Sequence, residues 1–450
     1  MKVYEIIRFC NDHFGINISS SYYHWIYQWY NWYKGYLDDF HKYAERDFIG
    51  QLTTHQMYRL NMGKRICEDW VSTILGDDQE ITCETGQTTI DEFLQDNKFW
   101  SRMSEFLERT FATGTGAICA EIESVNYDNL ARVNGYNYKL RFYDGLHVLP
   151  VSYDEEKCIT DVIVWSTITH EGKTRYKIVR YNTDEKIINN VLVDNDFSVV
   201  DSFDTITDKK LFAVYKPNIN NSLDNTSPMG VSVLDACLDG LKACDLAFNN
   251  FCKDIRLGAK KVFVNSDLVK YTDEGQPISP DELQQQLFMV IGSDLAEGKQ
   301  TLYQDYNPSL RIDENVNAIK NALSMVALKS GLGRNFYGTN ESSGHYNTAT
   351  EFIGSQQDLL KNAKKHFGLI SDVTCEFLAE LLDMNVHDLS WAMDAIYLID
   401  AEGERDKAIQ EVQNGIMSKV EFRQKYYGNT EEEAKKALEE NVSLEDLFNA

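Results

Sequence analysis

The sequence predicts an α+β fold that is mostly α-helical with one β-rich segment. Residues 117–214 contain short alternating runs rich in Val, Ile, Thr and Tyr, separated by Asn-Gly and Glu-Gly turn signals, which is typical of antiparallel sheet. Residues 231–255 and 312–328 instead repeat apolar side chains every three or four positions, as amphipathic helices do. A further long helix is expected over residues 348–382.

The N-terminal third is expected to be helical and well packed. Residues 22–33 read YYHWIYQWYNWY, and aromatic side chains at this density usually form a core. A base-stacking platform would need a basic groove, and only Lys34 lies nearby. A helix is predicted for residues 54–74.

The linker at residues 216–230 separates the sheet from the first amphipathic helix, residues 231–255. We call the apolar stripe of such a helix its seam and the helix a seam helix. Asp245 interrupts the seam of this first helix. A buried unpaired carboxylate is costly, so Asp245 is expected to have a partner, such as a lysine of a neighbouring subunit. A strand at residues 261–264 and a helix at 281–290 are expected next.

The second seam helix carries its apolar residues on one face and a polar stripe on the other. The seam consists of Ile312, Val316, Ile319, Leu323 and Val326. The opposite stripe consists of Asp313, Asn317, Lys320 and Ser324, with Asn321 beside it. A polar Gly/Ser/Asn-rich stretch, residues 334–347, follows Gly331 and Gly333, and the last fifty residues suggest small acidic helices with capping boxes at Ser418–Glu421 and Thr430–Glu433.

Composition excludes several classes of protein. At 450 residues and 43% hydrophobic, the chain can build two or three packed regions, so it is not disordered. No apolar run approaches the roughly 18 residues of a membrane span, and no secretory signal starts the chain, so a soluble intracellular protein is expected. The nine scattered cysteines include no C-x-x-C pair and predict reduced, mostly buried thiols.

The formal charge of −26 disfavours tight binding of nucleic acid by its phosphates. It permits DNA that only passes by, because an acidic wall discourages sticking.

No catalytic motif is found. The glycines at Gly114 and Gly116 lack the third glycine of a dinucleotide loop, and no G-x-x-x-x-G-K-[ST] or G-x-S-x-G occurs. The nine histidines form neither H-E-x-x-H nor H-x-H. We therefore expect no catalytic residue, no metal and no cofactor, although carboxylates distant in sequence could still assemble a two-metal nuclease.

Three collinear groups of segments resemble the portal proteins of tailed bacteriophages, in the family common in phages of Gram-positive hosts. They are NMGKRICEDW at 61–70; YKPN at 215–218 with SPMGVSV at 227–233 and LGAKKVFV at 257–264; and NPSLR at 307–311 with GLG at 331–333 and TATE at 348–351. No single segment is a signature, and the similarity rests on their order. The aromatic N-terminus departs from the family, so residues 1–50 carry little weight.

The resemblance implies a portal fold and a ring of about twelve subunits at one capsid vertex. Its regions would be a wing (1–227), stem helices (228–258 and 312–332), a clip between them (259–311), a tunnel loop (333–347), a long wing helix (348–400) and crown helices (401–450). The tunnel loop would include Arg334, Asn335, Phe336, Tyr337, Asn340, Glu341, His345 and Asn347.

The same resemblance implies double-stranded DNA in the channel, and the terminase large subunit, head-completion adaptors, scaffolding protein and major capsid protein as partners. The location would be the virion, with assembly in the host cytoplasm. If the stem is as implied, the polar stripe from Asp313 to Ser324 is a candidate channel wall, and an outer solvated face is the alternative. Lys320 could then touch phosphates. Two other interpretations remain: another head-assembly or adaptor protein, and a metal-dependent nuclease.

Overall fold

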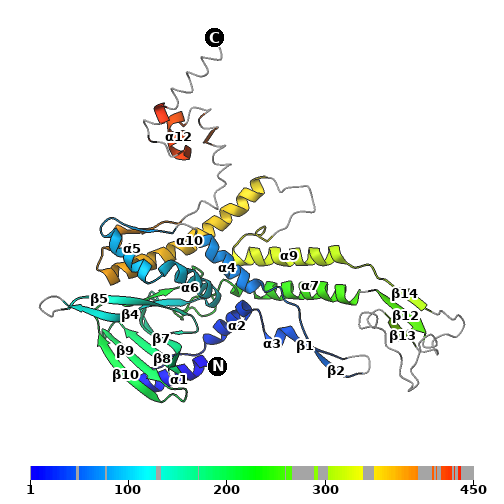
Figure 1. Cartoon of the computed structure of the whole chain (residues 1–450), viewed down its shortest axis with the longest axis horizontal. Helices are drawn as coiled ribbons and strands as arrows, with labels where there is room; N and C mark the ends of the chain where they lie inside the picture. Colours follow the sequence, from blue (N-terminus) through cyan, green and yellow to red (C-terminus); the bar gives the residue numbers. More distant parts are fainter. Residues whose placement is uncertain are drawn as a thin grey trace, which may run out of the picture.

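The computed structural model describes residues 2–46, 50–76, 79–127, 133–170, 172–258, 260–265, 288–291, 303–337, 349–393, 408–409, 412, 417–427, 430 and 434–436. The predicted α+β class is confirmed. A body of helices and antiparallel sheets carries a projecting pair of long helices (Figure 1). None of the helices in these ranges is long and apolar enough to cross a membrane.

A five-stranded antiparallel sheet forms one side of the body, as the alternating sequence predicted. Its order is β10 (Val199–Ile206), β9 (Ile187–Val193), β8 (Lys173–Asn182), β7 (Ile159–His170) and β6 (Val148–Tyr153). Successive residues of β7 face opposite ways: Ile163 and Trp165 join the core under the N-terminal helices, and Val162 and Val164 join the core under the rest of the body. Both faces of the sheet are therefore covered at β7.

A second sheet has the order β11 (Phe212–Tyr215), β4 (Gly116–Tyr127) and β5 (Val133–Asp144). Helix α6 (Phe99–Thr113) packs on β4 and β5, and α10 (Ala349–Leu382) packs beside β11. The long helix predicted for residues 348–382 is thus confirmed. Helix α4 (Met62–Ile74) joins α6 and α10 in the same core.

The aromatic N-terminal segment packs as core, as predicted. Helices α1 (Lys2–Phe14) and α2 (Tyr23–Lys34) lie on the five-stranded sheet, and Trp29 is fully buried. The Tyr23 hydroxyl donates to the Val148 carbonyl at 2.6 Å, and the Trp29 indole N–H donates to the Asp235 carboxylate at 3.0 Å. Each buried polar atom of these two side chains therefore has a partner.

The helix predicted for residues 54–74 is wrong in its first part. After α3 (Asp38–His41), residues of β1 (Lys42–Arg46) pair with β2 (Leu52–Gln56) as an antiparallel hairpin, and α4 starts only at Met62. Asn61 has a left-handed φ of 56°, which no α-helix continues through. This residue sets the start of α4.

The first seam helix also begins later than residue 231. A short 3₁₀ turn, η1 (Asp235–Cys237), leads into α7 (Leu238–Leu257). The Val233 N–H and the Ser232 hydroxyl both donate to the Phe111 carbonyl near the end of α6, at 3.2 and 2.9 Å. These bonds hold Ser232 and Val233 against the end of α6, and the chain then turns at residues 233–234, so the helix starts only after them.

The predicted strand at 261–264 is confirmed as β12 (Lys261–Asn265), which pairs with β13 (Phe288–Ile291) and β14 (Tyr303–Tyr306). The helix predicted for 281–290 is wrong over 288–290, because the apolar run FMVI pairs with β12 instead; residues 281–287 lie outside the described ranges.

Smaller elements complete the described chain: β3 (Ile81–Cys83) pairs with β15 (Leu389–Trp391), next to α5 (Gln87–Asp96) and η4 (Val386–Asp388). In front of α12 (Lys419–Tyr427), the Ser418 N–H donates to the Glu421 carboxylate and the Glu421 N–H to the Ser418 hydroxyl, which confirms that capping box. Glu433 of the second predicted box lies outside the described residues. All nine cysteines are free, and six are buried.

The buried imidazole of His366 on α10 should make the folded chain less stable in acid. Burial lowers the pKa of its imidazole to about 4, and its Nδ1 accepts the Asn218 N–H at 2.9 Å. As the pH falls, the unfolded chain therefore takes up a proton on this imidazole before the folded chain does. The contribution of neutral His366 to the free energy of unfolding, ~3 kcal/mol at most, is lost between pH 6.5 and about 4.

We expect the midpoint of thermal unfolding to fall less steeply over that window in a His366→Gln variant than in the unmodified chain. Differential scanning fluorimetry at half-unit pH steps measures this, and parallel curves would contradict it.

Candidate functional site

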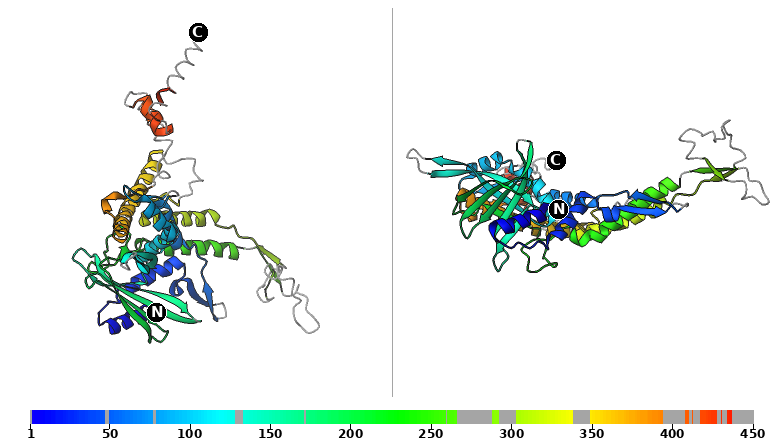
Figure 2. Two further views of the ribbon diagram at one scale, coloured as in Figure 1. Left: turned by 60° about the vertical axis from the view of Figure 1, so that its left-hand side comes forward. Right: turned by 90° about the horizontal axis from the view of Figure 1, so that it is seen from below.

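The most distinctive feature of the structure is a pair of long helices that leaves the body side by side. Helix α7 runs outward, β12–β14 lie at the far end, and α9 (Ile312–Ser330) runs back (Figures 1 and 2). The second predicted seam helix is thus confirmed and extends two residues further than expected. The pair corresponds in sequence to the expected stem.

Two contacts set the geometry of the pair. Near its far end, the Asp254 carboxylate of α7 accepts from Arg311 at 2.7 and 2.8 Å and from Asn315 at 2.7 Å, and these bonds lower its pKa. Near the body, Gly240 allows close approach, because a Cβ there would lie only 2.7 Å from a methyl group of Val326. The two helices are therefore fixed to each other at both ends.

Asp245 of α7 joins the pair to the body. It is buried, and its two carboxylate oxygens accept from His41 Nε2 at 3.0 Å and from the Leu60 N–H at 2.7 Å. His41 Nδ1 accepts the Leu37 N–H at 2.9 Å, so the ring is neutral with its proton on Nε2. The partner that the sequence called for is therefore this histidine of the same chain and not a lysine of a neighbour.

The candidate channel-wall residues lie on the face of α9 away from its seam. Asp313, Asn317 and Asn321 are exposed, and Lys320 is half-buried. Ser324 is also half-buried, and its hydroxyl donates to the Arg334 carbonyl at 3.1 Å. Ser324 therefore helps to hold the segment after α9, while the other four are available to solvent.

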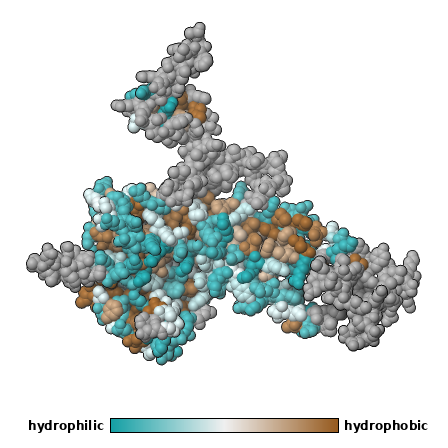
Figure 3. Space-filling view, in the orientation of Figure 1, coloured by the Kyte–Doolittle hydropathy of each residue, from teal (hydrophilic) through white to brown (hydrophobic). Residues whose placement is uncertain are grey.

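Sequence reasoning missed the apolar residues exposed on the same helices. Met325 and Leu328 of α9 are 56% and 54% exposed, and Leu246 and Leu257 of α7 are 40% and 63% exposed. Figure 3 shows apolar surface gathered over α9. Ile312, assigned to the seam, is also exposed. The sequence does contain this second apolar stripe, because Met325 and Leu328 lie outside the seam at helical spacing.

The first part of the expected tunnel loop is anchored. The Tyr337 hydroxyl donates to the buried Asp69 carboxylate at 2.6 Å, and Arg65 binds the same carboxylate at 2.8 Å. Burial and the neighbouring Asp69 raise the pKa of the Tyr337 hydroxyl well above its usual range. Phe336 packs edge-on against Tyr337, with ring centroids 5.0 Å apart.

The turn before this segment is held as well. The Trp70 indole donates to the Ser330 carbonyl at 3.1 Å, and the Asn362 amide to the Gly331 carbonyl at 2.9 Å. Arg334 and Asn335 lie in the short turn between Gly333 and Phe336. Asn340, Glu341, His345 and Asn347 lie outside the described residues.

The described ranges hold no group of three or more His, Cys, Asp or Glu side chains placed to bind a metal ion. The structure therefore adds no support to the two-metal nuclease interpretation.

No protein-family model matches the chain, and no curated protein matches it. Among solved structures, the chain is similar to one described as "Neck of native GTA particle computed with C12 symmetry". The similarity has 12% sequence identity and a TM-score of 0.45, and it covers 80% of this chain and 88% of that chain.

Replacing Asp245 by asparagine tests the junction of α7 with the body. In Asp245→Asn the amide N–H₂ would face the Nε2–H of His41, and a change of tautomer would leave the Leu37 N–H without its acceptor. We expect a loss of about 1–3 kcal/mol in the free energy of unfolding, and faster amide hydrogen exchange over residues 37–60. Asp239→Asn, at an exposed position of the same helix, is the control and should leave both unchanged.

Removing the Tyr337 hydroxyl tests the anchor of the segment after α9. Tyr337→Phe leaves the buried Asp69 with Arg65 alone and should lower the free energy of unfolding by about 1–3 kcal/mol, the usual range for a hydrogen bond to a charged group. Tyr58→Phe removes an exposed hydroxyl and serves as the control. Equal denaturation midpoints for the two variants would show that the hydrogen bond contributes nothing.

Proposed function

We propose that the chain is one subunit of a portal ring, the channel at one capsid vertex through which viral double-stranded DNA is packaged, retained and ejected. The ring would contain about twelve subunits. It would be a structural component of the virion, assembled in the host cytoplasm, and would carry out no reaction itself.

The observation that carries the proposal is the exposed apolar surface on the projecting helix pair. Two packed helices that stand clear of the body should hide their apolar side chains between them, yet Leu257, Met325 and Leu328 each remain more than half exposed. Exposed patches of this kind mark interaction surfaces. A neighbouring subunit with its own helix pair in the same position would cover them.

Exposed apolar residues on both helices favour a ring of subunits related by rotation. The exposed residues belong to both helices, Leu246 and Leu257 on α7 and Met325 and Leu328 on α9, so the α7 side of one subunit can meet the α9 side of the next. Such a head-to-tail contact closes into a ring when the rotation allows it. The helix pairs would then surround a central channel.

The polar part of α9 suits the wall of such a channel. Asp313, Asn317 and Asn321 present acidic and neutral side chains, and the whole chain has a formal net charge of −26. An acidic wall repels phosphates and lets DNA slide. Lys320 would be the local exception that touches the DNA backbone.

The remaining regions follow from the resemblance to portal proteins. The segment 259–311, which includes β12–β14, would be the clip and would bind the terminase large subunit and later the head-completion adaptors. The body would face scaffolding and major capsid proteins, and residues 333–347 would form the tunnel loop. The order of the segments quoted above supports these assignments.

Electron microscopy of the purified full chain tests the proposal directly. We expect rings with a central hole wide enough for a DNA duplex. A preparation that stays monomeric at micromolar concentration would contradict a portal, and open filaments would point to a different assembly.

The helix-pair interface has a sharper test. Met325→Glu together with Leu328→Glu places charges on the exposed apolar face, so rings should be lost while the circular dichroism spectrum is kept. Ile206→Glu, at an 82% exposed apolar position on β10, is the matched control and should still form rings. Rings in the double variant would remove α9 from the interface.

A further inference from the structure

Strand β10 forms an open edge of the five-stranded sheet. It is the last strand in the order of that sheet, and no further strand of the described residues pairs with it. Seven of its eight residues are exposed, and among them the apolar side chains of Phe203 and Ile206 are 57% and 82% exposed. Figure 1 shows β10 at the margin of the body, on the side away from the helix pair. A long, apolar, uncovered edge strand is prone to pair with another strand.

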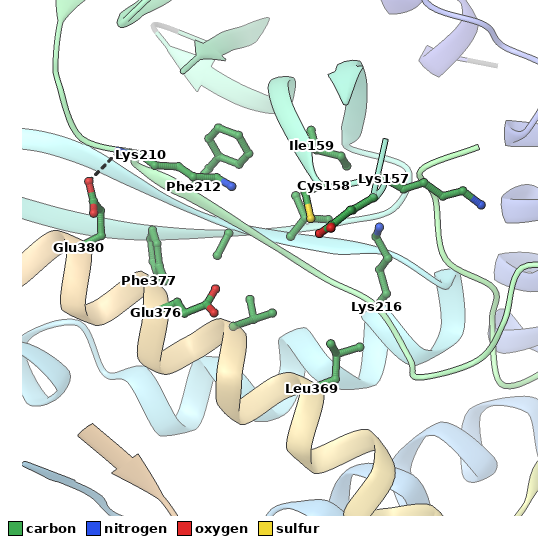
Figure 4. A pocket seen from close by; sticks show the side chains of 14 residues that line it. Lys157, Cys158, Ile159, Lys210, Phe212, Lys216, Leu369, Glu376, Phe377 and Glu380 are labelled. Carbon is green, nitrogen blue, oxygen red and sulfur yellow. Dashed lines mark hydrogen bonds between the residues drawn. The ribbon is translucent and has the colours of Figure 1, made fainter. Parts of the chain in front are cut away.

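The chain covers the outer edges of β6 and β11. At β6, the Val148 carbonyl accepts the Tyr23 hydroxyl, and Pro150 has no N–H to donate. At β11, helix α10 packs alongside, and the Lys210 N–H donates to the Glu380 carboxylate of that helix at 3.4 Å (Figure 4). Neither edge is therefore open to another strand.

The outer edge of β5 is also occupied, at Tyr138 and Leu140. The Asn97 side chain donates to the Tyr138 carbonyl at 3.4 Å and accepts the Leu140 N–H at 2.9 Å. Arg102 donates to the Leu140 carbonyl at 3.2 Å. The edge of β10 thus differs from the other three outer edges of the two larger sheets, because no other element of the described chain forms a hydrogen bond with it.

The backbone groups of alternate residues along β10 point away from the sheet. The Thr207 N–H, just beyond the strand, donates to the Lys186 carbonyl at 3.0 Å. Hydrogen-bonded positions alternate along an antiparallel ladder, so the backbone groups of Ser202, Asp204 and Ile206 point away from β9. Within the described residues, the N–H and C=O groups of Asp204 and Ile206 have no hydrogen-bond partner. They can therefore pair with an added strand.

The side chains of β10 give this edge a definite pattern. Asp201 and Phe203 lie on one face of the sheet, and Asp204 and Ile206 lie on the other, because side chains alternate along a strand. Each face of the edge thus offers one carboxylate and one apolar side chain. Residues 199–206 contain no basic residue.

We propose that an extended segment of a partner protein adds to this sheet beside β10, and that the segment combines apolar and basic side chains. Its backbone would pair with Asp204 and Ile206, as in other cases of strand addition. Running antiparallel to β10, it would place apolar side chains opposite Ile206 and Phe203, and lysine or arginine opposite Asp204 and Asp201. The order along the segment would be apolar, any, basic, apolar, any, basic. This inference does not depend on the portal proposal, whose subunit contact lies on the helix pair.

Charge favours a basic partner over a second copy of the chain. Two copies of β10 paired with each other would bring two aspartates each, and no basic residue, onto neighbouring strands in any register. Like charges on paired strands are destabilising. The β6 edge of a second copy cannot receive β10 either, because Pro150 and the hydrogen bond from Tyr23 close it. A segment with two basic residues would instead form ion pairs with Asp201 and Asp204.

Four capped hexapeptides test the proposal against the full chain. The first is acetyl-Val-Thr-Lys-Val-Thr-Lys-amide, and the second has glutamine in place of both lysines. The third is the first peptide N-methylated at its third and fifth residues, whose N–H groups would face β10. The fourth is N-methylated at its second and fourth residues, whose N–H groups would face away from β10, and is the matched control. The readout is hydrogen exchange at the Asp204 and Ile206 amides, resolved by mass spectrometry over a range of peptide concentrations.

We expect the amides of Asp204 and Ile206 to exchange rapidly in the protein alone and slowly with the first and fourth peptides. The glutamine peptide should need a roughly three- to tenfold higher concentration for the same protection, because two exposed ion pairs are lost. The third peptide should not protect. Asp201→Asn with Asp204→Asn should make the first two peptides equal at Ile206. Asp239→Asn with Asp358→Asn, the same change of charge at exposed positions elsewhere, should change nothing.

Each other outcome overturns a part of the proposal. Rapid exchange with every peptide removes the site, and protection by the third peptide removes strand addition. Equal protection by the lysine and glutamine peptides in the unmodified chain removes the preference for a basic segment. Slow exchange of Asp204 and Ile206 without any peptide, abolished by Phe203→Asp, would show that a second copy occupies the edge.

Discussion

The burial of one carboxylate, that of Asp245, determines how the projecting helices relate to the body. An ionised side chain inside protein requires hydrogen bonds to each oxygen, and the segment 37–60 supplies them through His41 and the Leu60 N–H. Those bonds fix the β1–β2 hairpin beside α7 and fix the direction of α7. Because Asp254 and Gly240 then set α9 against α7, the whole helix pair inherits its orientation from this buried group.

Sequence patterns were sufficient for elements whose side chains alternate or repeat along one segment. The sheet strands between residues 117 and 214, the two seam helices and α10 were predicted correctly for that reason. The pattern failed where a distant contact decides the conformation. Residues 231–234 are not helical because Ser232 and Val233 donate hydrogen bonds to the Phe111 carbonyl, and residues 52–56 form a strand because β1 lies beside them.

The candidate sites show the same limit. That Asp245 needs a partner follows from its place in an apolar seam, but His41 lies 204 residues away and nothing local identifies it. The role of Tyr337 as an anchor depends on Asp69, far from it in sequence. The position of β11 at the edge of its sheet could not be predicted either, because an edge exists only once the order of strands is known.

An open strand edge is normally a hazard, since it can pair with the edge of any other sheet. Here α10 limits that hazard, because Glu380 accepts the Lys210 N–H and the helix packs directly beside β11. The helix therefore occupies the side of β11 on which the edge of another sheet would otherwise pair.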